Sequence, residues 1–282
     1  MIQEDVFRYG EGDRGFGMVT FPKDVAHAPV VVIFNAGLIH REGPYRLNVL
    51  VGRALAELGY IAIRVDLSGK GDTPVREGLK NRESVALDWQ YIKQAILNRF
   101  GQRRLVLMGL CSGADNAIKI TAEEPDVYGL VLMDAVSPRD AGFVKRDLLR
   151  RLKNFHQWIN LPFALWRYFK RCLGGERSES DRIASLRDEP TDSDMHACFH
   201  KIVQRHGKVL AVFTSQASRN YNQRGQFARA INIPGLAPCC EEIYWPLVKH
   251  LYPLDVHRNR LIAEISRWAG DHLAYLRGEA ER

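Results

Sequence analysis

The sequence predicts an α/β fold, in which a mostly parallel, doubly wound sheet carries helices on both faces. Short apolar runs of strand length alternate with longer segments whose apolar residues recur at helical spacing. Several of the short runs are apolar throughout, as expected of strands buried on both faces. The chain has 282 residues, enough for one large core, so a single α/β unit with an insertion is expected rather than two independent domains.

The predicted elements follow one another in regular alternation. Apolar, β-branched runs predict strands at 30–37, at the start of 60–73, and at 103–109, 128–136, 208–215 and 241–248. Amphipathic periodicity predicts helices at 47–60, 82–100, 112–124, 223–232 and 257–276. The glycine-punctuated end of 60–73 is interpreted as a structural loop, because its spacing fits no phosphate-binding motif.

The alternation stops after the strand at 128–136 and resumes at 208–215. In between, residues 139–206 are helical in pattern and are broken by Pro162 and the polar stretch "GGERSESDR". From Phe143 to Cys172 there are eight Lys or Arg residues against one acid, Asp147, interleaved with aromatic residues. The pattern predicts a core in two parts, 1–138 and 207–282, with a helical insertion at 139–206 before the last two strands.

Composition limits the classes of function. Residues are 46% hydrophobic and 26% charged, and no apolar run approaches the roughly 18 residues needed to span a bilayer. The first residues lack a basic-then-apolar signal pattern, so a cytoplasmic location is expected. Five cysteines without CxxC spacing indicate free thiols, and neither a metal nor a cofactor is expected. The net charge of +7 permits an acidic partner, but no motif accompanies it that would indicate nucleic acid.

The segment "RRLVLMGLCSGADNAIKI", residues 103–120, places a candidate nucleophile on a sharp turn. Gly109 and Gly113 flank Cys111 at the junction of a predicted strand and a predicted helix. In such a turn the nucleophile is strained, and the residues two before and two after it must be small so that strand and helix can approach. Cys111 is therefore the candidate rather than Ser112, which would require a turn shifted by one residue. The alternative is an inert core cysteine.

The sequence at this point resembles the α/β-hydrolase fold superfamily. The segments "VVVIFNAGL", "RALAELGYIAIRVDLSGKGDT", "LVLMGLCSGA", "GLVLMDAV" and "HLYPLDVHRNRLIAEISRWA" occur in the order that this superfamily shows. The resemblance covers nearly everything except the insertion. In this superfamily the sharp strand-to-helix turn that carries the nucleophile is called the nucleophile elbow. More narrowly, the chain looks like the α/β-hydrolase-like proteins associated with exosortase and exopolysaccharide loci, in which a Gly-Leu-Cys elbow also occurs.

The resemblance implies a histidine base after the last strand. His250 has that position, whereas the nearby His257 falls in the following helix and is expected at the surface. The superfamily usually places an acid after the strand that corresponds to 208–215, but the loop there contains none. Asn220, with Asn222 second, falls closest to that position and would orient the imidazole by accepting its Nδ1 proton. Asp134, which ends the preceding strand, is the other candidate, since some members take the acid from there.

The resemblance also implies two backbone donors for an oxyanion. The amide of Ser112, at the helix N-terminus, is one, and it would also favour the thiolate of Cys111. The other is the amide of Gly37 or Leu38, in the loop after the first core strand. Asp115 is expected to face the surroundings of its helix rather than the reaction centre.

The insertion occupies the place where α/β hydrolases commonly carry a helical lid. Its aromatic residues would wall an apolar acyl pocket above Cys111, and its basic residues would meet an anionic substrate group, an acidic carrier protein or a membrane surface. The alternative is a solvated helical face whose aromatics pack against the core.

These observations predict an acyl hydrolase or acyltransferase acting on an ester, thioester or lactone. Cys111 would form a thioester, with His250 as general acid and base. The alternative is a catalytically degenerate scaffold that binds a ligand or partner, for which the missing acid after the strand at 208–215 is the best support. The substrate would be a small-molecule or carrier-bound acyl compound.

Overall fold

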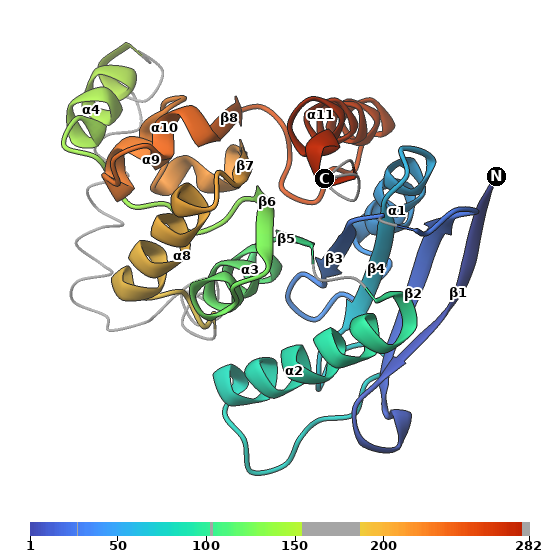
Figure 1. The fold of residues 1–282 in the computed structure, drawn as a ribbon. Helices are drawn as coiled ribbons and strands as arrows, with labels where there is room; N and C mark the ends of the chain where they lie inside the picture. Colours follow the sequence, from blue (N-terminus) through green and yellow to red (C-terminus); the bar gives the residue numbers. More distant parts are fainter. Residues whose placement is uncertain (27, 102–103, 154–186, 278–282) are drawn as a thin grey trace.

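One mixed sheet organises the chain. The computed structural model describes residues 1–26, 28–101, 104–153 and 187–277, and within these ranges eight strands are ordered β1-β2-β4-β3-β5-β6-β7-β8 (Figure 1). β1 (Ile2–Tyr9) and β2 (Gly15–Pro22) form an antiparallel hairpin, and β2 pairs antiparallel with β4. The other neighbours pair in parallel, which confirms the predicted mostly parallel sheet.

The parallel strands agree with the predicted ones in number and place. They are β3 (Val30–Phe34), β4 (Ile61–Asp66), β5 (Leu105–Leu110), β6 (Val127–Met133), β7 (Lys208–Thr214) and β8 (Cys240–Trp245). β8 is shorter than the predicted strand at 241–248, because Pro246 follows Trp245 and cannot donate to a ladder.

Helices cover both faces of this sheet, as predicted. The α-helices of the described residues are α1 (Leu47–Glu57), α2 (Asn81–Phe100), α3 (Ser112–Glu123), α4 (Phe143–Lys153), α8 (Asp192–Gln204), α9 (Gln226–Ile231), α10 (Leu236–Cys239) and α11 (Asp255–Leu273), of which α4 lies away from the sheet. Because side chains alternate along a strand, Val32 of β3 belongs to the buried cluster that contains residues of α2, α3 and α8, whereas Ile33 belongs to the cluster that contains residues of α1 and α11. Figure 1 shows these two groups of helices on opposite sides of the sheet.

The N-terminal hairpin was not among the predicted elements. Its outer strand, β1, is mostly exposed and buries only Phe7 and Tyr9, so it lacks the continuous apolar run of the central strands. The Tyr9 hydroxyl donates to the Asp66 carbonyl at the end of β4, 2.5 Å away, which ties the hairpin to the parallel part of the sheet.

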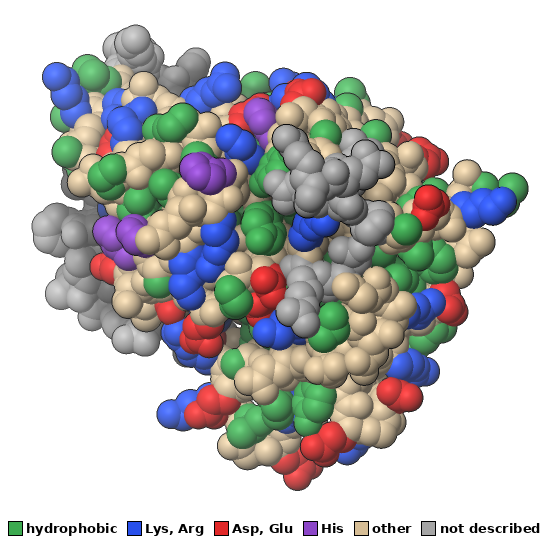
Figure 2. All heavy atoms as spheres, in the orientation of Figure 1, with side chains coloured by type: hydrophobic (Ala, Val, Ile, Leu, Met, Phe, Trp, Pro, Cys, Tyr) green, Lys and Arg blue, Asp and Glu red, His purple; other side chains and the backbone are tan. Residues whose placement is uncertain are grey.

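The insertion lies where the sequence predicts it, between β6 and β7 and therefore before the last two strands. It contains α4 and α8, while residues 154–186, with Pro162 and most of the aromatics, lie outside the described residues. On α4, Val144, Leu148 and Leu149 are exposed, and Figure 2 shows hydrophobic and basic side chains mixed over this helix at the upper left. Among the helices of the described ranges, none combines the length and apolarity that crossing a bilayer requires.

Parallel strands bring distant parts of the sequence to one edge of the sheet. β3, β5, β6, β7 and β8 all end at that edge. The residues that follow them are Gly37, Cys111, Asp134, Ser215 and His250 with their neighbours. In open α/β sheets this carboxyl edge is where ligands bind.

Candidate active site

The turn at Cys111 has the strained backbone that its sequence predicts. Cys111 has φ 55° and ψ −120°, an uncommon combination for a residue with a side chain. Its amide donates to the Met133 carbonyl of β6 at 2.8 Å, so the turn is attached to the neighbouring strand. The strain holds the sulfur away from the strand and at the N-terminus of α3.

The two glycines are required by contact rather than by backbone freedom. A Cβ added to Gly109 would lie 2.2 Å from the backbone carbon of Gly113. One added to Gly113 would lie 2.9 Å from the carbonyl oxygen of Asn35, which follows β3. Helix α3 therefore crosses close to β5 and β3 only because both positions lack a side chain.

His250 is hydrogen-bonded to a carboxylate and lies close enough to Cys111 for each to shift the other's pKa. Its Nδ1 donates to Oδ2 of Asp134 at 2.6 Å, which leaves Nε2 as the ring nitrogen that can exchange a proton with Cys111. Burial disfavours the imidazolium, but the bonds to Asp134 and Cys111 outweigh it and raise the pKa of His250 to about 9 from its ordinary 6.5. The ring is 21% exposed, so a reacting group can reach it from the solvent side.

Cys111 is half-buried, and its environment favours the thiolate. Burial raises the pKa of the thiol, but the hydrogen bond with His250 and the positive charges of Arg187 and His250 lower it by more. The net result is a pKa for Cys111 below its ordinary value of 9.0. Burial raises the pKa of two other cysteines, Cys198 and Cys240, so the described cysteines differ strongly in reactivity.

The Asp134 carboxylate is held in place by hydrogen bonds other than the one from the histidine. The residue is 4% exposed, and its carboxylate accepts the amide and the hydroxyl of Thr214, each at 2.6 Å. Its own φ is 47°, which turns the chain out of β6 directly after the strand. A buried carboxylate with these partners can hold an imidazole ring in one orientation and one tautomer.

The oxyanion candidates lie around the same turn. Ser112 is the first residue of α3, so its amide has no partner within the helix. The amide of Gly37 donates to the Ser112 hydroxyl at 2.8 Å, a contact that no sequence pattern predicts. Leu38, the alternative donor, follows with 85% of its surface exposed.

Comparison with solved structures identifies this architecture. An esterase from Pyrococcus furiosus superposes with a TM-score of 0.61 at 12% identity, over 97% of this chain and 92% of that one. A dienelactone hydrolase from Anabaena variabilis gives 0.57 at 12% identity over 96% and 98%. The mouse α/β-hydrolase domain-containing protein 10 gives 0.54 at 16% identity over 95% and 99%. The chain has the α/β-hydrolase fold. Neither family models nor curated protein sequences gave a match.

Within this α/β-hydrolase fold, Asn220 does not contact the histidine side chain. Its Oδ1 accepts from Arg139 Nε at 3.1 Å, and its carbonyl accepts from Gln226 Nε2. Asn222, the second candidate, accepts from Arg146 Nε at 2.8 Å. The carboxylate at His250 is that of Asp134, so of the two orienters that the sequence left open the geometry favours Asp134. His257 lies in α11, as predicted, but it is half-buried there and not at the surface as expected.

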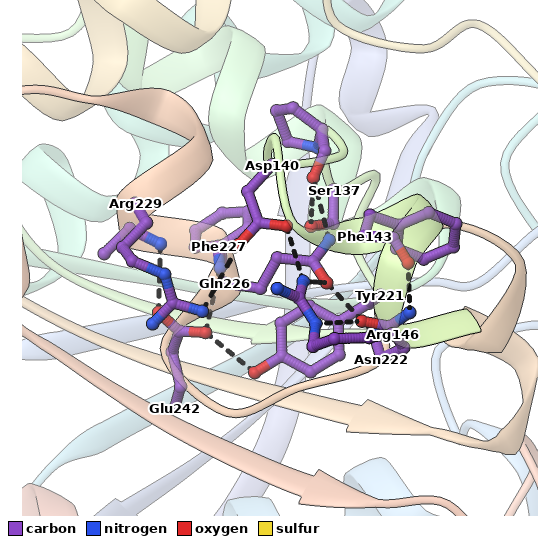
Figure 3. A network of polar contacts seen from close by, with 12 residues as sticks. Ser137, Asp140, Phe143, Arg146, Tyr221, Asn222, Gln226, Phe227, Arg229 and Glu242 are labelled. Carbon is purple, nitrogen blue, oxygen red and sulfur yellow. Dashed lines mark hydrogen bonds and ion pairs between the residues drawn. The ribbon is translucent and has the colours of Figure 1, made fainter. Parts of the chain in front are cut away.

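The two asparagines belong instead to a network that attaches the insertion to the core. Arg146 of α4 pairs with Asp140 at 2.5 Å and reaches Asn222, whose Nδ2 donates to the Phe143 carbonyl (Figure 3). Glu242 of β8, 4% exposed, accepts the Tyr221 hydroxyl and two amides at the start of α9. This network holds the start of the insertion against the loop between β7 and α9.

Arg187 and Asp115 are the site residues that the sequence did not predict. The Nε of Arg187 lies 2.5 Å from Oδ2 of Asp115, which is fully buried one turn after Cys111. The carboxylate of Asp115 bonds Arg187 and the amide of Val136, both of which lie outside its own helix. Arg187 lies near the end of the insertion, in a polar stretch without periodicity, and no signal in the sequence connects it with the elbow.

Proposed function

We propose that this chain is an acyl hydrolase or acyltransferase that forms a thioester on Cys111. The observation that carries the proposal is the hydrogen bond from His250 to Asp134 together with the strained turn at Cys111, whose thiol and the His250 imidazole shift each other's pKa. A nucleophile, a base and an orienter in mutual contact form the arrangement that acyl transfer requires. An ester, thioester or lactone is the substrate class.

Acylation begins from a thiolate and an imidazolium. The Cys111 sulfur attacks the acyl carbonyl carbon and forms a carbon–sulfur bond, while the carbonyl π electrons move to the oxygen. As the tetrahedral intermediate collapses, the bond to the leaving group breaks, and His250 Nε2 gives that group its proton. The products of this half-reaction are a thioester on Cys111, a neutral His250 and a free alcohol or thiol.

Deacylation reverses these roles. Neutral His250 takes a proton from water or from another acceptor, which attacks the thioester carbonyl. The second intermediate expels the sulfur as a thiolate and restores the imidazolium, so atoms and charge balance over the cycle. Asp134 keeps Nδ1 protonated throughout, so that Nε2 is the nitrogen that exchanges the proton.

The amide of Ser112 is the first proposed donor to the oxyanion. The second is the amide of Gly37 or Leu38. Because Gly37 donates to the Ser112 hydroxyl at 2.8 Å, its amide serves the substrate only when that hydroxyl rotates away. Each well-placed donor contributes roughly 3 kcal/mol to transition-state stabilisation in acyl transfer.

Apolar surface near the site suits an acyl substrate. Leu38 is 85% exposed beside the proposed oxyanion donor, and Leu247 is 89% exposed in the loop that carries His250. Tyr45 follows the loop that carries Leu38, and Arg258 of α11 follows the loop that carries Leu247. The guanidinium of Arg258 lies over the ring of Tyr45. Large apolar side chains that stay exposed on both loops indicate an apolar ligand, and a carrier-bound acyl chain meeting the basic insertion remains part of the proposal.

A binding scaffold without turnover is the weaker alternative. Its support was the absence of an acid in the loop after β7, and Asp134 supplies a carboxylate to His250 from β6 instead. The structural neighbours include an esterase and a dienelactone hydrolase, which fits a hydrolase, although likeness at 12% identity concerns the fold alone. The proposal therefore depends on the chemistry of Cys111.

Selective alkylation of Cys111 and turnover together test the proposal. Iodoacetamide near neutral pH is expected to label Cys111 before Cys198 and Cys240, whose pKa values are raised by burial, as measured by peptide mass spectrometry. Acyl esters and thioesters of graded chain length are then assayed with the wild type, Cys111→Ala and the matched control Cys239→Ala, another half-buried free cysteine. Full activity of folded Cys111→Ala, or no labelling of Cys111, contradicts the proposal.

A further inference from the structure

Arg187 is held by two groups near the nucleophile turn, the Asp115 side chain of α3 and the Asp134 carbonyl after β6. Its Nε bonds Oδ2 of Asp115 at 2.5 Å, and its Nη2 lies 3.4 Å from the carbonyl oxygen of Asp134. Asp115 is attached to the turn itself, because its amide donates to the Cys111 carbonyl at 3.1 Å. The guanidinium therefore lies at the place where the elbow and the end of β6 meet.

The aspartate that holds Arg187 is itself immobilised. Asp115 is 0% exposed, and its second oxygen accepts the Val136 amide at 3.1 Å. The Arg187 side chain keeps 22% of its surface exposed, so it lies between the buried Asp115 carboxylate and the solvent. Its contact with Glu189, at 3.9 Å, is longer and with an exposed carboxylate.

The charges around the sulfur do not balance without Arg187. The groups that act on Cys111 are His250, Arg187 and Asp115, and His250 in turn carries the Asp134 carboxylate. Two buried carboxylates thus surround one imidazolium and the guanidinium. Of these groups, His250 and Arg187 lower the pKa of Cys111, and Asp115 raises it.

The Arg187 guanidinium supplies a permanent positive charge, which His250 cannot. His250 must lose its positive charge during the reaction and above about pH 9, whereas arginine stays charged at every pH at which the protein is folded. A fixed cation near a thiolate favours the ionised sulfur in both states of the base.

We infer that Arg187 is a positioning residue for the nucleophile, whose guanidinium, held on Asp115, keeps negative charge on the Cys111 sulfur. The inference rests on the proposed function and adds Arg187, a residue of the insertion, to the proposed active site. It assigns a role in the chemistry to the segment that joins the insertion to α8.

The test is the pH dependence of Cys111 alkylation by iodoacetamide in the full chain, measured by peptide mass spectrometry. For Arg187→Gln we expect the midpoint to rise by about one pH unit, which lowers the labelling rate at pH 7 about tenfold. Arg187→Lys retains a charge and is expected to keep most of the wild-type profile. The matched control is Arg82→Gln, which breaks a comparable pair with Asp194 of α8 at 2.6 Å. Its midpoint is expected to stay at the wild-type value.

A second variant separates the charge effect from misfolding. Arg187→Gln alone leaves a buried carboxylate unpaired, so the double variant Arg187→Gln/Asp115→Asn removes both charges and keeps two amides that can bond each other. Its midpoint is also expected above that of the wild type, because no fixed cation then remains on the Asp115 side of the turn. An unchanged midpoint in either variant, with circular dichroism showing the wild-type fold, overturns the inference.

The proposed function fails in a distinguishable way. Wild-type Cys111 that reacts at no pH, or whose midpoint does not rise on His250→Ala, overturns the thiolate–imidazolium pair and with it the inference. A wild-type profile that moves with His250→Ala but not with Arg187→Gln overturns only the role of Arg187.

Discussion

His250 and Asp134 meet across a strand to which neither belongs. Asp134 follows β6 and His250 follows β8, yet the histidine Nδ1 lies 2.6 Å from Oδ2 of Asp134. Between them, Thr214 at the end of β7 donates its amide and hydroxyl to the same carboxylate. Three neighbouring strand ends thus build one hydrogen-bonded unit, and the behaviour of the site follows from it.

Removing the carboxylate charge is expected to impair turnover with little effect on substrate binding. In Asp134→Asn, an amide nitrogen turned toward His250 would require Nδ1 to accept and would place the ring proton on Nε2, where it blocks proton uptake. A loss of roughly 10²-fold or more in kcat is expected, and steady-state kinetics on an acyl ester measures it.

Asn220→Ala is the control for this substitution. The Asn220 side chain bonds Arg139 and not the histidine, so its removal is expected to leave kcat unchanged. A large loss in Asn220→Ala together with an unaffected Asp134→Asn would reverse the assignment of the orienter.

The pH dependence of kcat/KM is expected to be bell-shaped. Activity should rise with pH through the lowered pKa of Cys111, because the thiolate fraction increases, and the rise should begin below the ordinary thiol value of 9.0. It should fall as pH passes about 9, because the raised pKa of His250 marks the loss of the imidazolium that protonates the leaving group. Initial rates over a range of pH values test both limbs, and a maximum well above pH 9 would contradict the pairing.

Alanine substitutions of the two candidate nucleophiles, Ser112 and Cys111, are expected to affect activity differently. Ser112→Ala removes only the acceptor of the Gly37 amide, which is exposed and can bond water instead, so activity is expected within about tenfold of the wild type. Cys111→Ala is expected to abolish turnover. The assay that compares the two also tests the shifted turn, since loss of activity on Ser112→Ala alone would favour the serine.

Side chains at the elbow glycines are expected to destabilise the protein. In Gly109→Ala and Gly113→Ala the new Cβ meets backbone atoms at 2.2 Å and 2.9 Å, so α3 must move away from the sheet. A loss of about 1–3 kcal/mol in the free energy of unfolding is expected from overpacking. Urea denaturation measures it, with iodoacetamide labelling to follow the position of Cys111.

Gly270 provides the matched glycine. It lies within α11, and a Cβ there would meet nothing within 4 Å. Gly270→Ala is therefore expected to stabilise the protein, by up to about 1 kcal/mol, through helix propensity alone. Equal effects at all three glycines would show that close packing at the elbow is not what requires them.

Local patterns were sufficient for the central part of this molecule. Continuous apolar runs predicted β3 to β7, since each is buried on both faces and carries that burial in its composition. The elbow was also readable, because a tight strand-to-helix turn needs small residues at fixed spacing from the nucleophile. The N-terminal hairpin was not, because the exposed edge strand β1 buries few side chains.

By itself, then, the sequence determined the α/β architecture, the place of the insertion and Cys111 as a candidate, since each depends on residues close together in the chain, and its resemblance to a fold superfamily added His250. Only the tertiary structure shows that His250 bonds Asp134 and not Asn220, that the Gly37 amide donates to Ser112, and that Arg187 pairs with Asp115. Those contacts join residues that are distant in the chain, and which segments meet at the edge of a sheet is set by strand order and packing rather than by any local pattern.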